Sequence, residues 1–143
     1  MPPAQFVSIV DDDIDITNLF YDALGTIPGL QIFKFTNPII ALEHFKTNQA
    51  SYSLVISDLR MPEMNGLELL KEVKSLSPRL RTILVTAFEV NDKVFDDYKK
   101  NDIIDLVIQK PVRIRELIEH VNNSLNKIET APLTKENPRK NIC

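Results

Sequence analysis

The sequence predicts an α/β fold in which a parallel five-stranded sheet carries helices on both faces. Short apolar runs of strand length alternate five times with stretches whose apolar residues have helical spacing, and this alternation is typical of parallel strands joined by helices. Residues 54–56 are apolar throughout, as expected of a strand that is covered on both faces. The chain has 143 residues, 43% of them apolar, which suits one domain with a substantial core.

The predicted strands are short runs rich in apolar and β-branched residues, and the predicted helices each carry an apolar face. The strands are residues 6–10, 32–35, 54–57, 82–85 and 104–108. In chain order, the apolar positions of the helices are Ile16, Leu19, Phe20, Ala23 and Leu24, then Leu42 and Phe45, then Leu69, Leu70, Val73 and Leu76, then Val94, Phe95 and Tyr98, and finally Ile114, Leu117, Ile118, Val121, Leu125 and Ile128.

Cap and turn residues mark the ends of these helices. Asp13 is a suitable N-cap for the first helix, and residues 25–29, with two glycines and a proline, end it. Asn37 caps the second helix, with Pro38 at its first position. We expect the fourth helix to end at Asn101, since asparagine tolerates a left-handed conformation.

Composition argues against several classes of function. The net charge of −3 gives no reason to expect direct binding of nucleic acid. The one cysteine, Cys143, cannot form an intrachain disulfide, so a reducing compartment is expected. The first residues lack the pattern of a signal peptide, and no apolar run is long enough to span a bilayer. We therefore expect a cytoplasmic protein that does not contact a membrane.

Five polar side chains follow or end the predicted strands. Asp11 and Asp12 follow the first strand, Asp58 ends the third, Thr86 follows the fourth and Lys110 follows the fifth. Because the carboxyl ends of parallel strands lie at one edge of a sheet, these side chains are expected to converge there.

The chemistry of this set is coherent. Carboxylates held close together repel one another, and a hard cation such as Mg²⁺, which prefers oxygen ligands, relieves that repulsion. With a phosphoryl donor present, Asp58 is suited to act as a nucleophile and form an aspartyl phosphate. Lys110 offers a positive charge to the phosphoryl group, and the Thr86 hydroxyl offers a hydrogen bond.

The chain resembles the receiver domain of two-component response regulators. The motifs that carry the resemblance are residues 9–12, 58–66, 86–87 and 110–111, and the resemblance spans roughly residues 6–127. It implies a flavodoxin-like, doubly wound sheet with strand order 2-1-3-4-5 and five helices. We expect residues 1–128 to form the receiver domain and residues 129–143 to form a flexible C-terminal tail, because the tail has prolines and charges but few apolar residues.

The resemblance also implies a role for each site residue. Asp58 corresponds to the phosphoacceptor. The direct ligands of Mg²⁺ or Mn²⁺ would be Asp58, Asp12 and the backbone carbonyl of Arg60. Asp11 would bind the ion mainly through water. Thr86 and Lys110 correspond to the residues that contact the phosphoryl group. The peptide bond between Lys110 and Pro111 is expected to be cis.

Further expectations concern partners and departures from the family. The family implies a sensor histidine kinase or histidine phosphotransfer protein as phosphodonor, a downstream effector protein as target, and a chain that is monomeric or weakly dimeric. Val107 stands where receivers usually carry a tyrosine or phenylalanine, and Phe88 is a bulky group two residues after Thr86.

Alternative readings exist for single residues and for the whole chain. We expect Met61 and Met64 to be packing residues, and His44 and His120 to be solvated. One alternative function is an interaction module that signals weakly or without phosphorylation, which Val107 suggests. Another is an enzyme that binds FMN or acts as a phosphatase, but acidic residues after the first strand repel a flavin phosphate.

Overall fold

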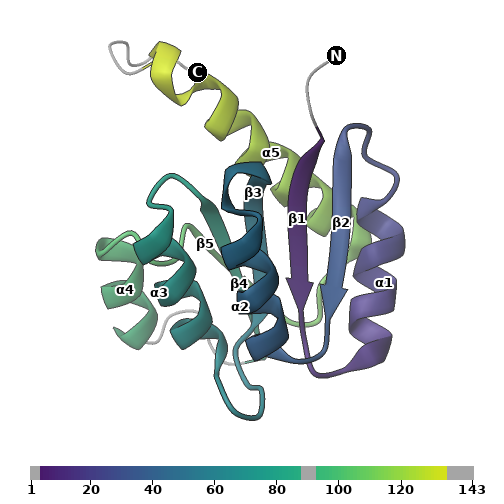
Figure 1. Cartoon of the computed structure of the whole chain (residues 1–143). Helices are drawn as coiled ribbons and strands as arrows, with labels where there is room; N and C mark the ends of the chain where they lie inside the picture. Colours follow the sequence, from purple (N-terminus) through teal and green to yellow (C-terminus); the bar gives the residue numbers. More distant parts are fainter. Residues whose placement is uncertain (1–3, 88–92, 135–143) are drawn as a thin grey trace.

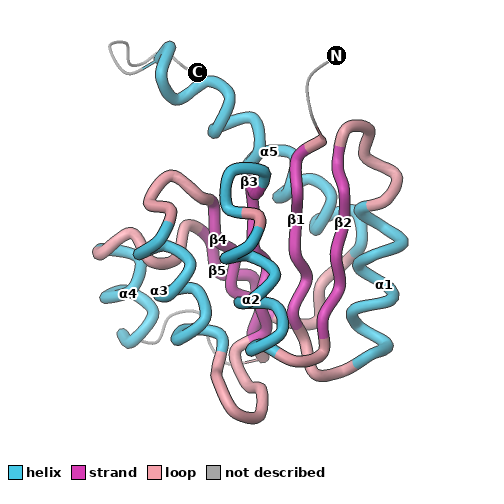
Figure 2. The backbone as a smooth tube through the Cα atoms, viewed as in Figure 1, coloured by secondary structure: helices cyan, strands magenta, loops and turns pink. Residues whose placement is uncertain are grey.

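The computed structural model describes residues 4–87 and 93–134, and within these ranges the chain forms one parallel sheet with helices on both faces (Figures 1 and 2). The strand order is β2-β1-β3-β4-β5. The elements are β1 Gln5–Val10, α1 Ile14–Leu24, β2 Leu30–Phe35, α2 Pro38–Thr47, β3 Tyr52–Asp58, α3 Gly66–Leu76, β4 Arg81–Thr86, α4 Lys93–Lys100, β5 Leu106–Gln109 and α5 Ile114–Thr134, with a short 3₁₀ turn at Gln49–Ser51. The predicted fold class and strand order are confirmed.

The core consists of one apolar cluster on each face of the sheet. Successive side chains of a strand point to opposite faces, so in β3 the side chain of Ile56 joins one cluster and that of Val55 joins the other. Residues of α1 and α5 complete the first cluster, and residues of α2, α3 and α4 complete the second, which is the layer in front of the sheet in Figure 1. This double cover explains why the central strands are apolar throughout.

The predicted helix starts are confirmed. The side chain of Asp13 accepts a hydrogen bond from the Asp15 amide, and the side chain of Asn37 caps α2, which has Pro38 at its start. Helix α3 opens with a capping box in which Asn65 and Glu68 accept from each other's backbone amides, both at 2.9 Å.

Two predicted core positions are wrong, because Leu19 and Leu76 are 47% and 40% exposed. In α1 the inward-facing position near Leu19 belongs instead to Thr17, which is buried. The Thr17 hydroxyl is satisfied by donating to the carbonyl of Ile14 at 2.8 Å, so a polar residue is tolerated there. Val94 and Ile128 lie outside the residues whose side chains are described.

Two predicted boundaries in the second half differ from the structure. The residue with positive φ after α4 is Asp102, at 60°, and not Asn101. The fifth strand begins at Leu106 and not at residue 104. The reason is that the amides of Ile103 and Ile104 donate to the carbonyl of Tyr98 and so close the end of α4 before the strand starts.

The predicted C-terminal tail overlaps the last helix. The sequence places the start of the tail at residue 129, whereas α5 continues to Thr134. Residues 135–143 lie outside the described residues, so the division into 1–128 and 129–143 stays a prediction. Within the described ranges, each helix is too short or too polar to cross a bilayer.

Gly66 allows α3 to begin directly against the end of β3. Its amide donates to the carbonyl of Leu59 at 2.8 Å. A Cβ atom on residue 66 would lie 2.1 Å from the backbone oxygen of Asp58 and 2.9 Å from Cδ1 of Leu84. A side chain at this position therefore has no room unless the end of β3, which carries Asp58, moves.

The substitution Gly66→Ala should lower the free energy of unfolding by about 2–3 kcal/mol, since the clash is with backbone and cannot relax by a rotamer change. Urea unfolding followed by circular dichroism measures this. Gly25→Ala is the matched control, because its Cβ would lie 3.2 Å from the nearest atom, and its expected effect is below about 1 kcal/mol. Equal stability of the two variants would show that the close approach is absent.

His44 is not solvated as the sequence suggested, since it packs among aromatic rings. Its ring centroid lies 4.3 Å from that of Phe33 and 5.4 Å from that of Phe35. Its Nδ1 is 2.7 Å from the Tyr52 hydroxyl, which also bonds the hydroxyl of Ser8. Burial raises the pKa of Tyr52 to about 12, although its hydrogen bond with Ser8 opposes this, and burial lowers the pKa of His44.

Stability should therefore fall as the pH drops from about 8 to about 6, because the unfolded chain protonates His44 near its ordinary pKa of 6.5 before the folded protein does. His44→Gln should reduce the slope of unfolding free energy against pH in this range. His120→Gln is the control and should leave the contribution of His44 in place. An unchanged slope in His44→Gln would contradict the prediction.

Candidate functional site

The parallel sheet brings the five predicted site residues to one edge. Asp11 follows β1, Asp58 is the last residue of β3, Thr86 is the last of β4, and Lys110 follows β5. This edge is the one to which the arrowheads of β1 and β2 point in Figure 1. Aligned register from β1 to β5 keeps these strand ends level, since Val10 pairs with Ser57, Asp58 with Val85 and Thr86 with Gln109.

Three carboxylates form a cluster that suits a hard divalent cation. One oxygen each of Asp11, Asp12 and Asp58 lies within 4.8 Å of the others. Asp11 is buried and Asp12 is exposed, so the cluster is open on one side and can keep water ligands on a bound ion. The carboxylate chemistry and the spacing therefore fit the magnesium ion that the sequence led us to expect.

Asp11 is the buried member of the cluster. Its Oδ1 accepts a hydrogen bond from the Asp13 amide at 2.9 Å. Burial raises the pKa of the Asp11 carboxyl and the neighbouring charge of Asp58 adds to this, while the Asp13 amide and Lys110 act in the opposite direction. The charged form of Asp11 is thus less favourable in the folded protein than in water, and a cation that joins the cluster would offset this cost.

Lys110 faces the carboxylates from the end of β5. Its Nζ lies 2.9 Å from Oδ1 of Asp58 and 3.3 Å from Oδ2 of Asp11. Burial by itself disfavours the ammonium ion, but the hydrogen bond to Asp58 and the charges of both carboxylates outweigh it and raise the pKa of Lys110. The side chain is therefore a stable positive charge beside Asp58.

Thr86 and Lys110 lie on neighbouring strand ends above a small pocket. Thr86 is buried, and its carbonyl accepts from the Lys110 amide at 2.7 Å. The pocket measures about 240 Å³ and is lined by Asp58, Leu59, Arg60, Thr86, Ala87 and Lys110. It therefore places a carboxylate, a hydroxyl-bearing residue and an ammonium around one cavity.

Sequence reasoning did not single out Leu59 and Ala87, which line this cavity. Each directly follows a predicted site residue in the chain, and that adjacency is the signal by which they could have been found. Their apolar side chains form part of the wall of the cavity.

Arg60 borders both the cavity over Asp58 and a second pocket beside Asp12 that includes Met61, Pro62 and Asn65. Arg60 thus lines both the pocket that contains Asp58 and the pocket that contains Asp12. Ligation by its carbonyl stays a prediction. Met61 and Met64 are partly buried against the second core cluster, as expected of packing residues.

The peptide bond after Lys110 and the side chain of Val107 on β5 were both singled out from the sequence. The Lys110–Pro111 peptide bond is cis. Val107 is partly buried against the second core cluster and pairs with Leu84 of β4, so an aliphatic side chain occupies the position where the family usually has an aromatic one. Phe88 lies outside the described residues.

The chain matches the family model described as the response regulator receiver domain over residues 7–122. It is 29% identical over 123 residues to the chemotaxis protein CheY of Bacillus subtilis, covering 86% of this chain and 99% of that protein. It is 27% identical to the response regulator receiver protein CpdR of Brucella abortus, covering 83% of this chain and 95% of that one.

Other relatives are longer than this chain. The transcriptional regulatory protein ZraR of Klebsiella oxytoca is 29% identical, and the match covers 90% of this chain but 28% of that protein. The match to the CpxR homologue of Haemophilus influenzae, at 32% identity, covers 83% of this chain and 49% of that protein. The chain thus spans less than half the length of these two regulators.

A solved structure has the same fold and similar size. The crystal structure of a CheY-like response regulator receiver domain protein from Methanospirillum hungatei superimposes with a TM-score of 0.80 at 26% identity and covers 90% of this chain and 98% of that one. The fold, the converging strand ends and the family match agree, and the protein belongs to the response regulator receiver domain family of two-component signalling.

Proposed function

We propose that this receiver accepts a phosphoryl group from a phosphohistidine donor onto Asp58 in a reaction that requires Mg²⁺, and that phosphorylation changes its conformation to signal to a partner protein. The observation that carries the proposal is the cluster of Asp11, Asp12 and Asp58 with the Lys110 ammonium 2.9 Å from Asp58. Family membership supports the general role in two-component signalling.

Each residue of the site has a defined task in this reaction. A carboxylate oxygen of Asp58 forms a bond to phosphorus while the bond from phosphorus to the donor histidine nitrogen breaks, and the imidazole leaves with the electron pair. Asp12, Asp58 and the Arg60 carbonyl would hold Mg²⁺, which would supply charge neutralisation. Lys110 exchanges its contact with the Asp58 carboxylate for a contact with a phosphoryl oxygen.

The conformational response begins at Thr86. A phosphoryl group adds roughly two negative charges and strong hydrogen-bond acceptors to the cavity. The Thr86 hydroxyl donates to a phosphoryl oxygen, and this shifts the loop that follows β4 and the start of α4. Phosphorylation then biases an equilibrium between two conformations, with Val107 in place of the usual aromatic side chain on β5.

The partners follow from this chemistry. A sensor histidine kinase or a histidine phosphotransfer protein supplies the phosphoryl group, and a downstream effector protein reads the phosphorylated surface. The domain assists its own phosphorylation and dephosphorylation but has no separate substrate that it turns over. We propose a cytoplasmic protein that is monomeric or weakly dimeric and does not bind nucleic acid directly.

Wild-type protein treated with a small-molecule phosphodonor and Mg²⁺ should gain the mass of one phosphoryl group, and Asp58→Asn should gain none, because an amide is not a nucleophile towards phosphorus. Intact-protein mass spectrometry measures the adduct. Asp13→Asn is a matched control next to the site, since asparagine also caps a helix well, and it should be phosphorylated normally. Absence of an adduct on the wild-type protein would favour a module that signals without phosphorylation.

Asp11→Asn should raise the melting temperature of the metal-free protein at neutral pH, because the charged form of the buried Asp11 is less favourable in the folded protein than in the unfolded chain. The folded-state pKa of Asp11 lies above 3.8, so protonated Asp11 stabilises the wild-type fold at low pH. This stabilisation is lost as the pH rises from about 3.8 through the folded-state pKa. Asparagine does not titrate, so the variant shows no such loss of stability. Stabilisation by Mg²⁺ should be large in the wild type and weak in Asp11→Asn.

Differential scanning calorimetry with and without Mg²⁺ measures both effects. Asp22→Asn, on the exposed side of α1, is the control and should respond to Mg²⁺ like the wild type. A variant Asp11→Asn that is less stable than the wild type without metal, or that responds fully to Mg²⁺, would contradict the role given to this carboxylate.

A further inference from the structure

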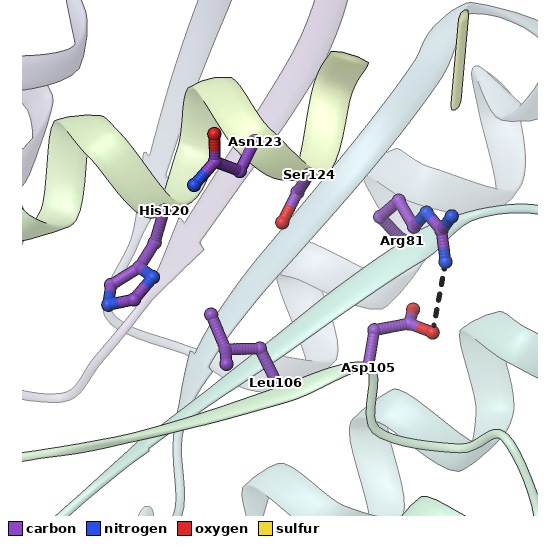
Figure 3. A pocket seen from close by; sticks show the side chains of 6 residues that line it. All are labelled: Arg81, Asp105, Leu106, His120, Asn123 and Ser124. Atoms are coloured by element: carbon purple, nitrogen blue, oxygen red, sulfur yellow. Dashed lines mark hydrogen bonds and ion pairs between the residues drawn. The ribbon is translucent and has the colours of Figure 1, made fainter. Parts of the chain in front are cut away.

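A second polar pocket lies at the amino edge of the sheet, between the starts of β4 and β5 and helix α5 (Figure 3). Its volume is about 350 Å³, and it is lined by Arg81, Asp105, Leu106, His120, Asn123 and Ser124. Arg81 is the first residue of β4 and Thr86 is the last, so roughly 16 Å of strand separates this pocket from the phosphoacceptor site. The proposed phosphorylation chemistry uses none of its residues.

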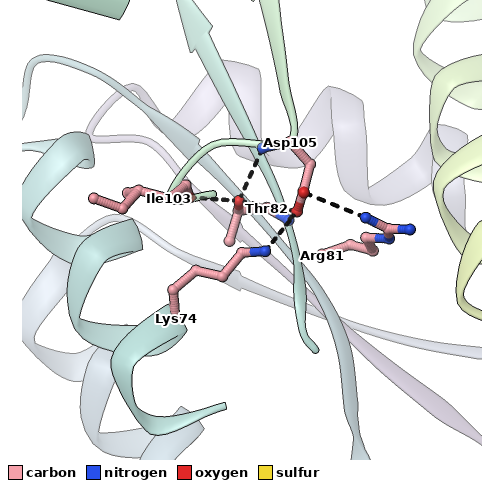
Figure 4. Close-up of polar contacts among 5 residues, drawn as sticks. All are labelled: Lys74, Arg81, Thr82, Ile103 and Asp105. Carbon is pink, nitrogen blue, oxygen red and sulfur yellow. Dashed lines mark hydrogen bonds and ion pairs between the residues drawn. The ribbon is translucent and has the colours of Figure 1, made fainter. Parts of the chain in front are cut away.

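Behind one wall of the pocket, the Asp105 carboxylate binds two cations, of which Arg81 lines the pocket and the buried Lys74 does not (Figure 4). Oδ2 of Asp105 lies 2.9 Å from Nζ of Lys74, and Oδ1 lies 3.3 Å from Nη1 of Arg81. The amide of Thr82 also donates to Oδ2 at 2.9 Å, and the Thr82 hydroxyl lies 3.3 Å from the same oxygen. Asp105 is therefore fully engaged, and the formal charges of the pocket lining, Arg81 and Asp105, balance.

Among the described residues, two donor groups beside this wall lack a hydrogen-bond partner. The Nε atom of Arg81 is buried and makes no hydrogen bond among the described residues. Ser124 is 8% exposed and lines the pocket, and within the described ranges its hydroxyl forms no hydrogen bond either. Figure 3 shows the Ser124 hydroxyl directed away from α5 into the space above Leu106. Buried polar groups are normally paired, so the unpaired Nε of Arg81 indicates a missing partner, and the Ser124 hydroxyl faces the same pocket.

The geometry of the guanidinium limits the chemistry of that ligand. Arg81 binds Asp105 through Nη1 alone, and its side chain is 25% exposed, so a rotation that exposes the buried Nε would offer Nε and the second Nη together. Such a fork matches the paired oxygens of a phosphate or carboxylate group. The Asp105 carboxylate is already occupied by donors from Lys74, Arg81 and Thr82, so it is not available to hold a cation, and the polar lining disfavours an apolar molecule.

We propose that this pocket binds a small oxyanion, either a phosphoryl or a carboxylate group, with Arg81 as the charged anchor and Ser124 and Asn123 as hydrogen-bond donors. The site is independent of Asp58, Lys110 and Mg²⁺. Its occupation joins β4, the segment before β5 and α5 through one ligand, so binding of the anion stiffens the amino edge of the sheet.

The test is a titration of the ¹⁵N-labelled full chain followed by amide chemical shifts. One arm uses inorganic phosphate and the other uses acetate, both without Mg²⁺ and at constant ionic strength set by sodium chloride. Saturable shifts centred on Arg81, Leu106, His120 and Ser124 are expected in at least one arm. Saturation with phosphate alone assigns a phosphoryl ligand, saturation with acetate alone assigns a carboxylate ligand, and saturation with both supports the shared chemistry.

Variants separate binding in this pocket from a general effect of anions. Ser124→Ala and Asn123→Ala should each weaken binding about 3- to 10-fold, the usual effect of losing one hydrogen bond. Asn122→Ala is the matched control, because Asn122 is an exposed neighbour on the same helix that does not line the pocket, and its affinity should equal that of the wild type. Arg81→Gln should abolish saturation, and circular dichroism shows whether it folds.

Three results would overturn the proposal. One is a shift that grows linearly with both anions and never saturates. Another is equal affinity for the anion in Ser124→Ala, Asn123→Ala and Asn122→Ala. This result would exclude binding in the pocket even if Arg81→Gln fails to fold. The last is a saturable response confined to the neighbourhood of Asp58 and Lys110, because that would place the anion at the phosphoacceptor site.

Discussion

Repulsion among carboxylates held at one edge of a parallel sheet is the constraint on which this protein depends. Asp11, Asp12 and Asp58 come within 4.8 Å of one another because their strands are neighbours in the sheet. Without a metal ion, the Lys110 ammonium contacts two of them and limits the repulsion. A divalent cation and a phosphoryl group both change this balance of charge, so the arrangement makes the local structure sensitive to what binds there.

The rest of the fold holds this unfavourable cluster in place. One apolar cluster packs against each face of the sheet. Gly66 allows α3 to begin in contact with the backbone of Asp58. Because paired strands are in register, the ends of β3, β4 and β5 lie side by side, and this brings Asp58, Thr86 and Lys110 together. The free energy that keeps the acidic groups together thus comes from burial of apolar surface far from them.

The two ends of β4 have different chemistry. Its carboxyl end presents Thr86 to the cavity above Asp58, whereas its amino end presents Arg81 to a network with Asp105 and the buried Lys74. The amino-end network fixes the segment between α4 and β5, because Asp105 binds both Thr82 and Arg81. Helix α4 is therefore anchored near its carboxyl end.

Most of the fold and the main site could be predicted because both depend on local patterns and on a simple rule of topology. Apolar runs and helical spacing indicate the elements, and parallel pairing then places Asp11, Asp58, Thr86 and Lys110 at one edge. Leu19 and Leu76 follow the helical periodicity of apolar residues, but packing leaves both exposed, so their predicted burial was wrong. The predicted start of β5 was wrong because the turn that closes α4 includes residues 103 and 104.

What the sequence determined by itself was therefore the order of the elements, the helix caps at Asp13 and Asn37, and the set of acidic and basic residues at the strand ends. Only the tertiary structure decided that His44 lies among aromatic rings, that Lys74 and Arg81 share Asp105, and that Ser124 borders a polar pocket. The physical reason is that these contacts join residues on different elements, and the spacing of residues along one element carries no information about which distant side chains will meet it.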